Sequence, residues 1–241
     1  MRRSPSVSLP RQILLRLLLL AVAILPATTP LKASHPDPKK FLFRLADNQK
    51  HVWTTPARSS TWKKTPTWVF IGLAAPSFSL DGDFSTHLRE STSLDGFNSF
   101  FASDTSDIIF ATLPLVFVLS GVATGSKRFT DFGWKSTEVA LTSWISTLGV
   151  KAVTQRSRPH EGHTYGFWKG GNSFSSGHAA VAWSLSALAV REFPDHRWVR
   201  WVAYPLAAAI SISRISSGNH FASDVVFGSL LGYSVGRYLP R

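Results

Sequence analysis

Apolar residues are grouped along this chain into runs that polar clusters separate. Gly, Pro, Asp and Ser occur between the runs, and the sustained alternation of apolar and polar residues that marks a β-strand is missing. This pattern predicts an all-α protein, a helical bundle with a core of about six helices. The segment 79–106 is rich in Asp, Ser, Thr and Phe, which predicts a loop with short helices. The apolar runs are 68–75, 108–124, 139–153, 179–190, 198–212 and 225–235.

The length of these runs bears on whether the helices cross a membrane. Most runs have about 12 to 15 residues, whereas about 20 are needed to span a bilayer. Only the run 108–124 approaches the lower limit, and the mean hydropathy of the whole chain is +0.05. The pattern therefore favours a soluble or membrane-surface bundle over a protein with several membrane spans, which is the alternative.

The N-terminus has the outline of a secretory signal peptide. Arg2, Arg3 and Arg11 precede the apolar run 17–25, which is broken at Pro26. We predict a signal peptide over residues 1–33, with an uncleaved N-terminal anchor as the alternative. Both place the body of the protein outside the cytoplasm, so we expect an exported protein that is periplasmic or membrane-associated.

The rest of the chain divides into an arm and one domain. Residues 34–66 are polar and basic, and we expect an arm that includes a short amphipathic helix. Residues 67–241 contain the apolar runs and form the predicted helical domain. A single domain is expected because 241 residues, 44% of them hydrophobic, can bury one core of their own.

Composition limits the partners and the chemistry. The chain has 26 Lys and Arg against 14 Asp and Glu, and its net charge of +12 favours phosphorylated substrates, anionic lipid head groups or nucleic acid. A solubilising basic surface explains many of these charges equally well. Nucleic acid is not expected, because no basic and aromatic platform repeats along a strand pattern. The absence of cysteine excludes disulfides, thiolate zinc sites and cysteine nucleophiles.

The first cluster of candidate chemistry is a pair of cations at the end of a predicted helix. Lys151 and Arg158 are seven residues apart, nearly two helical turns, which places them on one face about 10 Å apart along the axis. Pro159 disfavours helical geometry at Arg158 and ends the helix there. Two cations at one place predict an anion site, and a solvated basic strip is the alternative.

The second cluster, Ser175-Ser176-Gly177-His178, leads directly into an apolar run. A serine in this position caps a helix, so backbone N–H groups and the positive end of the helix dipole point outward beside Ser176 and Gly177. Such a helix start binds phosphate, and His178 in the first turn could deliver a proton to it. An ordinary cap with an incidental histidine is the alternative.

The third cluster contains Arg214, His220 and Asp224. His220 and Asp224 are four residues apart, so on a helix the carboxylate can hold one imidazole nitrogen and leave the other to attack phosphorus. Gly218 and Asn219 separate this helix from the one that carries Arg214, whose planar guanidinium suits two phosphate oxygens. The alternative is a local surface pair with Arg214 engaged elsewhere.

Two other chemistries lack support in the sequence. His160 and His163 lie in the loop 159–172 without the HExxH or a similar spacing of a zinc site, and a structural role in that loop is the better interpretation. The Gly-x-Ser-x-Gly motif of nucleophile-elbow hydrolases is absent. Neither a bound metal nor a serine nucleophile is therefore expected.

Taken together, the motifs Lys-x6-Arg-Pro, Ser-Gly-His and Ser-Arg-x5-His-x3-Asp resemble those of the type 2 phosphatidic acid phosphatase and vanadium haloperoxidase superfamily. The resemblance covers residues 151–224 and implies a helical bundle of the acid phosphatase and haloperoxidase type. One departure from the family pattern is Ser175, which stands where proline is usual.

The resemblance also implies a role for each residue of the three clusters. His220 would attack phosphorus to give a phosphohistidine, Asp224 would orient it, and His178 would protonate the leaving alcohol. Such a site needs no metal or other cofactor, although vanadate is expected to bind as an inhibitor. The phosphoryl oxygens would be bound by Lys151, Arg158, Arg214 and the backbone at Ser176 and Gly177.

The expected function is therefore an exported, metal-independent phosphatase. Its substrate would be a phosphorylated small molecule or a lipid phosphate at a membrane surface. Two alternatives remain, a haloperoxidase with vanadate as its cofactor and a non-catalytic helical module that binds anionic lipid. The haloperoxidase ranks lower, because haloperoxidases of this group are usually much longer chains.

Overall fold

A computed structural model describes residues 37–55, 72–101, 103–161 and 166–239 of the chain. All regular secondary structure in these residues is helical, which confirms the all-α class and the helical bundle. Residues 1–33, for which we predict a signal peptide or anchor, lie outside the described residues, as does His163.

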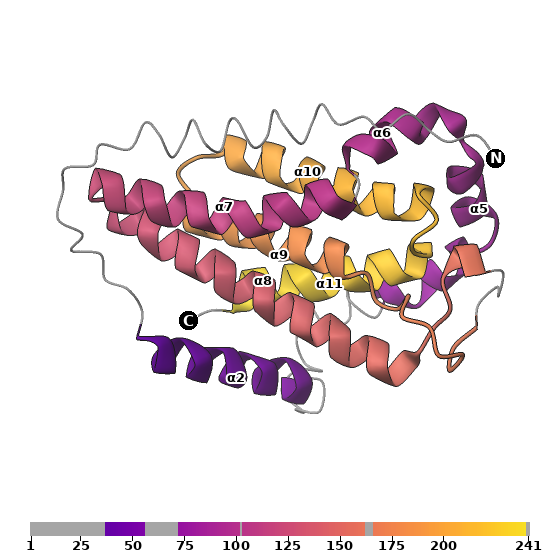
Figure 1. The fold of residues 1–241 in the computed structure, drawn as a ribbon, viewed down its shortest axis with the longest axis horizontal. Coiled ribbons are helices and arrows are strands. Elements are labelled where there is room, and N and C mark those ends of the chain that lie inside the picture. The colour runs from indigo at the N-terminus through magenta and orange to yellow at the C-terminus, as the bar shows by residue number, and fades with distance from the viewer. Residues whose placement is uncertain (1–36, 56–71, 102, 162–165, 240–241) are drawn as a thin grey trace.

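Five long helices form the body of the molecule and run antiparallel to one another in sequence order (Figure 1). Each contains one of the predicted apolar runs, and α7 and α8 are joined by only two residues, Gly125 and Ser126. The five helices are α7 (Ser103–Thr124), α8 (Lys127–Thr154), α9 (Gly177–Glu192), α10 (Trp198–Ser216) and α11 (Ala222–Tyr238).

The helices extend beyond the apolar runs inside them, so run length underestimates helix length. α7 has 22 residues and α8 has 28, because Ser126 caps α8 well before its apolar run begins and polar residues such as Glu138 are buried within it. Among the described helices, α7 alone is long and apolar enough to cross a membrane. Its segment Thr105–Thr124 has a mean hydropathy of 1.9, and only 11% of that segment is buried inside the molecule.

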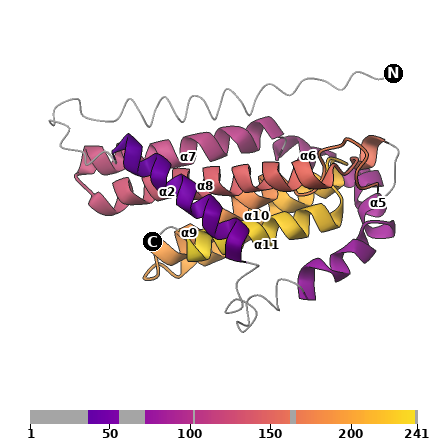
Figure 2. The same cartoon turned by 90° about the horizontal axis from the view of Figure 1, so that it is seen from below.

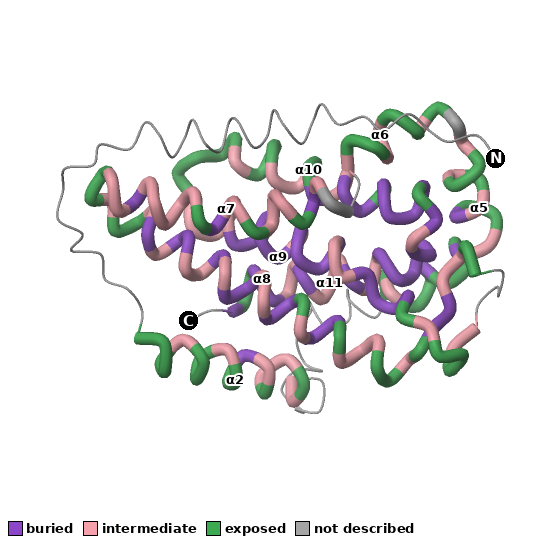
Figure 3. Tube along the Cα trace, in the orientation of Figure 1, coloured by how far each residue is buried: buried purple, intermediate pink, exposed green. Residues whose placement is uncertain are grey.

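The central helix of the bundle is α9, whose residues are mostly buried (Figure 3). It packs against α7, α8, α10 and α11. Leu185 and Leu188 of α9 belong to the main hydrophobic cluster together with Val139 of α8 and Val235 of α11. α9 is therefore the helix around which the other four long helices pack.

A line of three glycines lets α11 approach α9 closely. Gly228, Gly232 and Gly236 are four residues apart and share one face of α11. A Cβ atom added at Gly232 would lie 1.9 Å from the backbone oxygen of Ala180, far inside van der Waals contact, and the other two glycines face α9 in the same way. This close packing fixes the start of α11 beside the start of α9.

Short helices gather at the end of the bundle where α8 ends and where α9 and α11 begin (Figure 1). Three of them fall in the segment 79–106, for which a loop with short helices is predicted, and the fourth, η2 (Pro76–Leu80), overlaps its start. The loop that follows α8 adds a further turn, η4 (Pro159–Glu161). The other three short helices are α5 (Asp83–Glu90), η3 (Thr92–Leu94) and α6 (Asp95–Phe100).

The amphipathic helix expected within the basic arm is α2 (Pro38–Thr54), which crosses the outer face of α8 (Figure 2). Asp37 caps its first turn. Arg44 and Asn48 reach the carboxylate of Glu138 in α8 at 3.1 and 2.7 Å. A buried acid in α8 thus anchors α2 to the bundle.

Candidate active site

The three sequence clusters meet at the end of the bundle that carries the short helices. Lys151 lies in the last turn of α8, His178 in the first turn of α9, and Asp224 in the first turn of α11. Arg214 lies in the last turn of α10, and His220 follows in the short connection to α11. Because alternate helices of an antiparallel bundle end and begin on the same side, residues distant in sequence come together here.

His220 and Asp224 form the buried centre of this site, with relative exposures of 4% and 0%. Nδ1 of His220 lies 3.6 Å from Oδ2 of Asp224. His220 precedes the first residue of α11, so the pair does not share a helix face as predicted. Instead, Asp224 turns back over the helix start and accepts a hydrogen bond from the backbone N–H of Phe221 at 2.9 Å. With Asp224 beside Nδ1, the other ring nitrogen, Nε2, is the one suited to act as nucleophile.

Burial sets the charge of this pair. It lowers the pKa of His220 to about 4, although the nearby carboxylate of Asp224 opposes this change. The positive charges of Lys151 and Arg158 add to the lowering. Burial alone would raise the pKa of Asp224, but His220 and the charge of Arg156 outweigh it and keep that pKa below its usual value. A neutral imidazole therefore faces an ionised carboxylate at neutral pH.

Arg156 lies fully buried beside this pair and is not among the residues that the sequence predicted for the site. Its Nη1 donates to Oδ1 of Asp224 at 2.7 Å, and its Nη2 donates to Oδ2 of Asp81 at 2.6 Å. The guanidinium also lies 4.2 Å from the centre of the Phe221 ring. A cation removed from water in this way needs both carboxylates, and it keeps Asp224 charged in return.

Asp81, directly after η2, brings the N-terminal part of the chain into the site. Its carboxylate accepts from the backbone N–H of Ser223 at 2.8 Å and from the Ser223 hydroxyl at 2.6 Å. The sequence carries no sign of this role, because Asp81 is one of several acidic residues in a polar segment. Arg156 stands inside the first motif, but residue spacing alone does not separate a buried arginine from a surface one.

Lys151 and Arg158 do come together, but not through helical periodicity. α8 ends at Thr154, and Gln155 is in the left-handed conformation with φ 43°, so Arg158 lies in the loop beyond the helix. The prediction that both cations lie on one helix face is therefore wrong. Asn172 links them instead: its carbonyl oxygen accepts from Nζ of Lys151, and its side-chain oxygen accepts from Nε of Arg158 at 2.8 Å.

The charge of Lys151 is sensitive to pH. Burial lowers its pKa to about 8, the neighbouring Arg158 adds to the lowering, and Asp224 opposes it. Lys151 is therefore still largely protonated at pH 7 and loses its charge in mildly alkaline solution.

Ser176 caps α9 as the sequence predicted. Its hydroxyl accepts from the backbone N–H of Ala179 at 3.5 Å. Its own backbone N–H, however, donates to the carbonyl oxygen of Asp224 at 3.0 Å, so this N–H holds α9 to α11 and does not serve phosphate. Gly177, the first residue of α9, is the remaining predicted backbone donor, because the first N–H groups of a helix have no partner within the helix.

His178 lies at the rim of the site, next to an acidic residue of α7. Its Nε2 is 3.2 Å from Oδ1 of Asp107, and the two side chains are 22% and 66% exposed. Asp107 also interacts electrostatically with Arg214: burial lowers the pKa of Arg214, and the negative charge of Asp107 opposes that change. The sequence did not single out Asp107, which precedes an apolar run without any motif around it.

Arg214 is almost fully buried at the end of α10. Its Nη2 donates to the carbonyl oxygen of Phe101, at the end of α6, and to the Ser213 hydroxyl at 3.0 Å. The guanidinium is thus fixed in place between α10 and the short helices at this end of the bundle.

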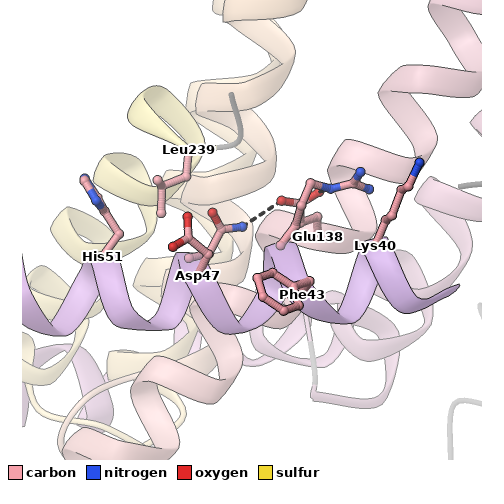
Figure 4. Close-up of a pocket in the computed structure, with 8 residues that line it drawn as sticks. Lys40, Phe43, Asp47, His51, Glu138 and Leu239 are labelled. Atoms are coloured by element: carbon pink, nitrogen blue, oxygen red, sulfur yellow. Dashed lines mark hydrogen bonds and ion pairs between the residues drawn. The ribbon is translucent and has the colours of Figure 1, made fainter. Parts of the chain in front are cut away.

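In the part of the chain that the structure describes, no group of metal ligands marks this site, and an open hollow lies elsewhere on the molecule. Among the residues that the structure describes, no three His, Cys, Asp or Glu side chains gather to hold a metal ion. An open hollow of about 570 Å³ lies between α2, α8 and the end of α11, away from the three clusters (Figure 4). It is lined by Lys40, Phe43, Arg44, Asp47, Asn48, His51, Glu138 and Leu239.

The C-terminal part of the chain matches a known family. The model of the PAP2 superfamily matches residues 132–241, which contain all three clusters but neither Asp81 nor Asp107. This match confirms the resemblance seen in the three motifs.

Curated relatives share parts of this sequence. Lipid A 1-phosphatase of Porphyromonas gingivalis is 38% identical over 66 residues, 27% of this chain and 15% of that protein. Bacitracin transport permease protein BcrC of Bacillus licheniformis is 43% identical over 61 residues, 25% of this chain and 29% of that protein. Lipid A 4'-phosphatase of P. gingivalis is 26% identical over 156 residues, 61% of this chain and 65% of that protein. The chain spans less than two thirds of each of these relatives.

A solved structure that the chain matches is the transmembrane PAP2 type phosphatidylglycerolphosphate phosphatase from Bacillus subtilis. The two share 18% sequence identity, and the match covers 83% of this chain and 92% of that one with a TM-score of 0.45.

Proposed function

Because residues 132–241 belong to the PAP2 superfamily, we propose that this protein is a phosphatase that hydrolyses phosphate monoesters through a phosphohistidine intermediate. The observation that carries the proposal is the buried, neutral imidazole of His220 beside the ionised carboxylate of Asp224. A neutral, oriented imidazole is a competent nucleophile toward phosphorus.

In the first chemical step, the Nε2 lone pair of His220 attacks phosphorus, and the P–O bond to the leaving group breaks. The leaving oxygen takes a proton from His178 and departs as an alcohol. The negative charge of the transition state spreads over the phosphoryl oxygens, where Lys151, Arg158 and Arg214 stabilise it together with the backbone N–H of Gly177.

In the second step, water attacks the phosphohistidine from the side that the alcohol has left. The water gives a proton to His178, which is now neutral, and the P–N bond breaks with its electron pair returning to His220. Inorganic phosphate leaves, and the starting protonation states are restored. Asp224, held ionised by Arg156, stabilises the positive charge that His220 carries while it is phosphorylated.

The fixed cations let this reaction proceed without a metal ion, in our proposal. Lys151, Arg158 and Arg214 supply the charge that magnesium supplies in many other phosphoryl-transfer enzymes. Turnover in the presence of EDTA is the direct check of this point.

Replacement of the nucleophile tests the proposal. We expect His220→Ala to lower the turnover of p-nitrophenyl phosphate and of a lipid phosphate in EDTA to background, because it removes the proposed nucleophile. The matched control is His196→Ala, which removes an exposed histidine from the far end of the bundle and should leave turnover unchanged. Turnover that persists in His220→Ala would contradict the mechanism, and bromide oxidation with peroxide and vanadate would identify a haloperoxidase instead.

A lipid phosphate is the substrate class that the surroundings of the site favour. Apolar side chains are exposed at this end of the bundle, among them Phe84 at 45%, Phe100 at 55% and Trp168 at 76%. Such side chains suit the acyl chains of a lipid whose head group reaches the cations. The names of two relatives, both lipid A phosphatases, point to the same class of substrate.

We also propose that the enzyme works at a membrane. α7 can cross a bilayer by length and hydropathy, and α10 exposes further apolar side chains, including Trp198 at 62%, Trp201 at 75% and Val202 at 55%. Lipid chains would cover these surfaces and bring the active site close to its substrate.

A further inference from the structure

Asp107 is a charged residue at the rim of the active site to which the mechanism above gives no part. It lies near the start of α7, and its carboxylate is 66% exposed. A negative charge beside an anion-binding site repels phosphate, so on its own it would weaken substrate binding. Its place 3.2 Å from Nε2 of His178 indicates a compensating role.

We propose that Asp107 is a positioning residue for the general acid: it holds the imidazolium of His178 in the charged form and in the orientation from which the leaving group takes its proton. This inference rests on the proposed function, in which His178 protonates the leaving alcohol. Asp107 itself touches neither the phosphoryl group nor the nucleophile in this scheme.

Two side chains of α7 hold the His178 ring. Asp107 contacts Nε2, and Phe110, three residues further along α7 and therefore on the same face, lies with its ring centre 6.1 Å from that of His178. An ion contact at one edge and an aromatic neighbour leave the imidazole little freedom to rotate. α7 thus orients a residue that α9 supplies.

The chemistry of the first step needs His178 to be protonated. The imidazolium gives one proton to the leaving oxygen and becomes neutral, and Asp107 takes no part in that transfer. A carboxylate within contact distance favours the charged imidazole over the neutral one. Because Asp107 is exposed, solvent weakens this effect, and we expect a moderate contribution to the rate.

The same carboxylate does not make the site repel its substrate. Asp107 also attracts the positive charge of the buried Arg214, so that cation offsets part of the negative charge of Asp107. Lys151 and Arg158 act electrostatically on His220 and add two further positive charges to the site. The phosphoryl position therefore keeps an excess of positive charge with Asp107 present.

Leaving groups that differ in their need for a proton separate this role from a structural one. The p-nitrophenolate anion leaves without protonation, whereas an alkoxide needs the proton of the general acid. We expect Asp107→Asn to lower kcat/KM for an alkyl phosphate about 10- to 100-fold and for p-nitrophenyl phosphate less than about threefold, because a positioning residue contributes less than the roughly 10²- to 10⁴-fold of the general acid itself. We use kcat/KM because it reports the step that forms the phosphoenzyme.

Four further variants complete the experiment. His178→Ala should show the same dependence on the leaving group, and Asp107→Asn in that background should add no further loss, because both act on one proton transfer. Asp107→Glu should restore part of the activity toward the alkyl phosphate. Asp95→Asn, which removes an exposed acid from the first turn of α6, should leave both substrates unaffected.

The outcomes separate this inference from the proposed function. Suppose that the loss in His178→Ala depends on the leaving group. Equal losses of kcat/KM for the two substrates in Asp107→Asn, or a lower KM with an unchanged ratio between their kcat/KM values, would then overturn the role of Asp107 alone. If the loss in His178→Ala does not depend on the leaving group, His178 is not the general acid. Its role in the proposed mechanism and the role of Asp107 then both fail.

Discussion

Lys151 and His220 show how burial prepares single residues for phosphate chemistry. Burial lowers the pKa of Lys151 to about 8 and the pKa of His220 to about 4. At neutral pH the two side chains therefore have different charges. His220 becomes a base that is free of its proton at neutral pH, whereas Lys151 stays cationic there with little margin. The two values bound the pH range in which these two groups have the charge states that the proposed mechanism needs.

The pH dependence of kcat/KM for p-nitrophenyl phosphate tests these two charges. His220 must be deprotonated and Lys151 protonated, so we expect activity to rise with pH near 4 and to fall with pH near 8. In Lys151→Arg the guanidinium stays charged, and the falling limb should move up by more than about one pH unit. The rising limb should stay where it is, as the internal control. An unmoved falling limb in this variant would show that Lys151 does not set it.

At the scale of elements, the contact between α9 and α11 decides where the reactive groups stand. Gly228, Gly232 and Gly236 let α11 lie against the backbone of α9, and the N–H of Ser176 then reaches the carbonyl oxygen of Asp224. Separation of the two helices would therefore move His178 away from the nucleophile.

Substitution of the middle glycine tests this packing. The Cβ of Gly232→Ala would lie 1.9 Å from the oxygen of Ala180, and we expect a loss of about 1–3 kcal/mol in stability together with a loss of activity. The matched control is Gly96→Ala in α6, where a Cβ meets nothing within 4 Å. Thermal unfolding measured in one detergent compares the two variants, and equal stabilities would contradict the close contact.

At the scale of the whole molecule, the two flanks of α7 differ in charge. Lys127 and Arg128 follow the end of α7 after two residues, whereas the nearest basic residue before α7 is Arg89. Because basic flanks stay on the cytoplasmic side of a membrane span, a spanning α7 would place the active site outside the cytoplasm.

Cysteine labelling in intact cells tests this orientation, since the chain has no cysteine of its own. We expect Ser99→Cys, in α6 at the active-site end, to react with a membrane-impermeant maleimide. His196→Cys, in the turn between α9 and α10, should react only after the membrane is permeabilised. The reverse pattern would contradict the outward orientation of the site.

The sequence by itself determined the helical class and singled out the residues that we propose to act on phosphate, because apolar runs and short motifs are local properties. It did not determine how those residues meet. Arg158 reaches Lys151 through Asn172 and not along a helix, and the N–H of Ser176 is used by the fold. The role of Arg156 is visible only in the tertiary structure, because its burial is what distinguishes it from a surface arginine.

The contacts of Asp81 and Asp107 with the site were likewise decided by the tertiary structure alone. Each lies outside the three motifs, and each reaches the site from an element earlier in the chain, η2 or α7. The physical reason is that a carboxylate acquires its role from the cation or imidazole placed next to it, and that neighbour is brought near by helix packing. Local sequence therefore defines which groups can react, and the packing of the helices defines which of them act together.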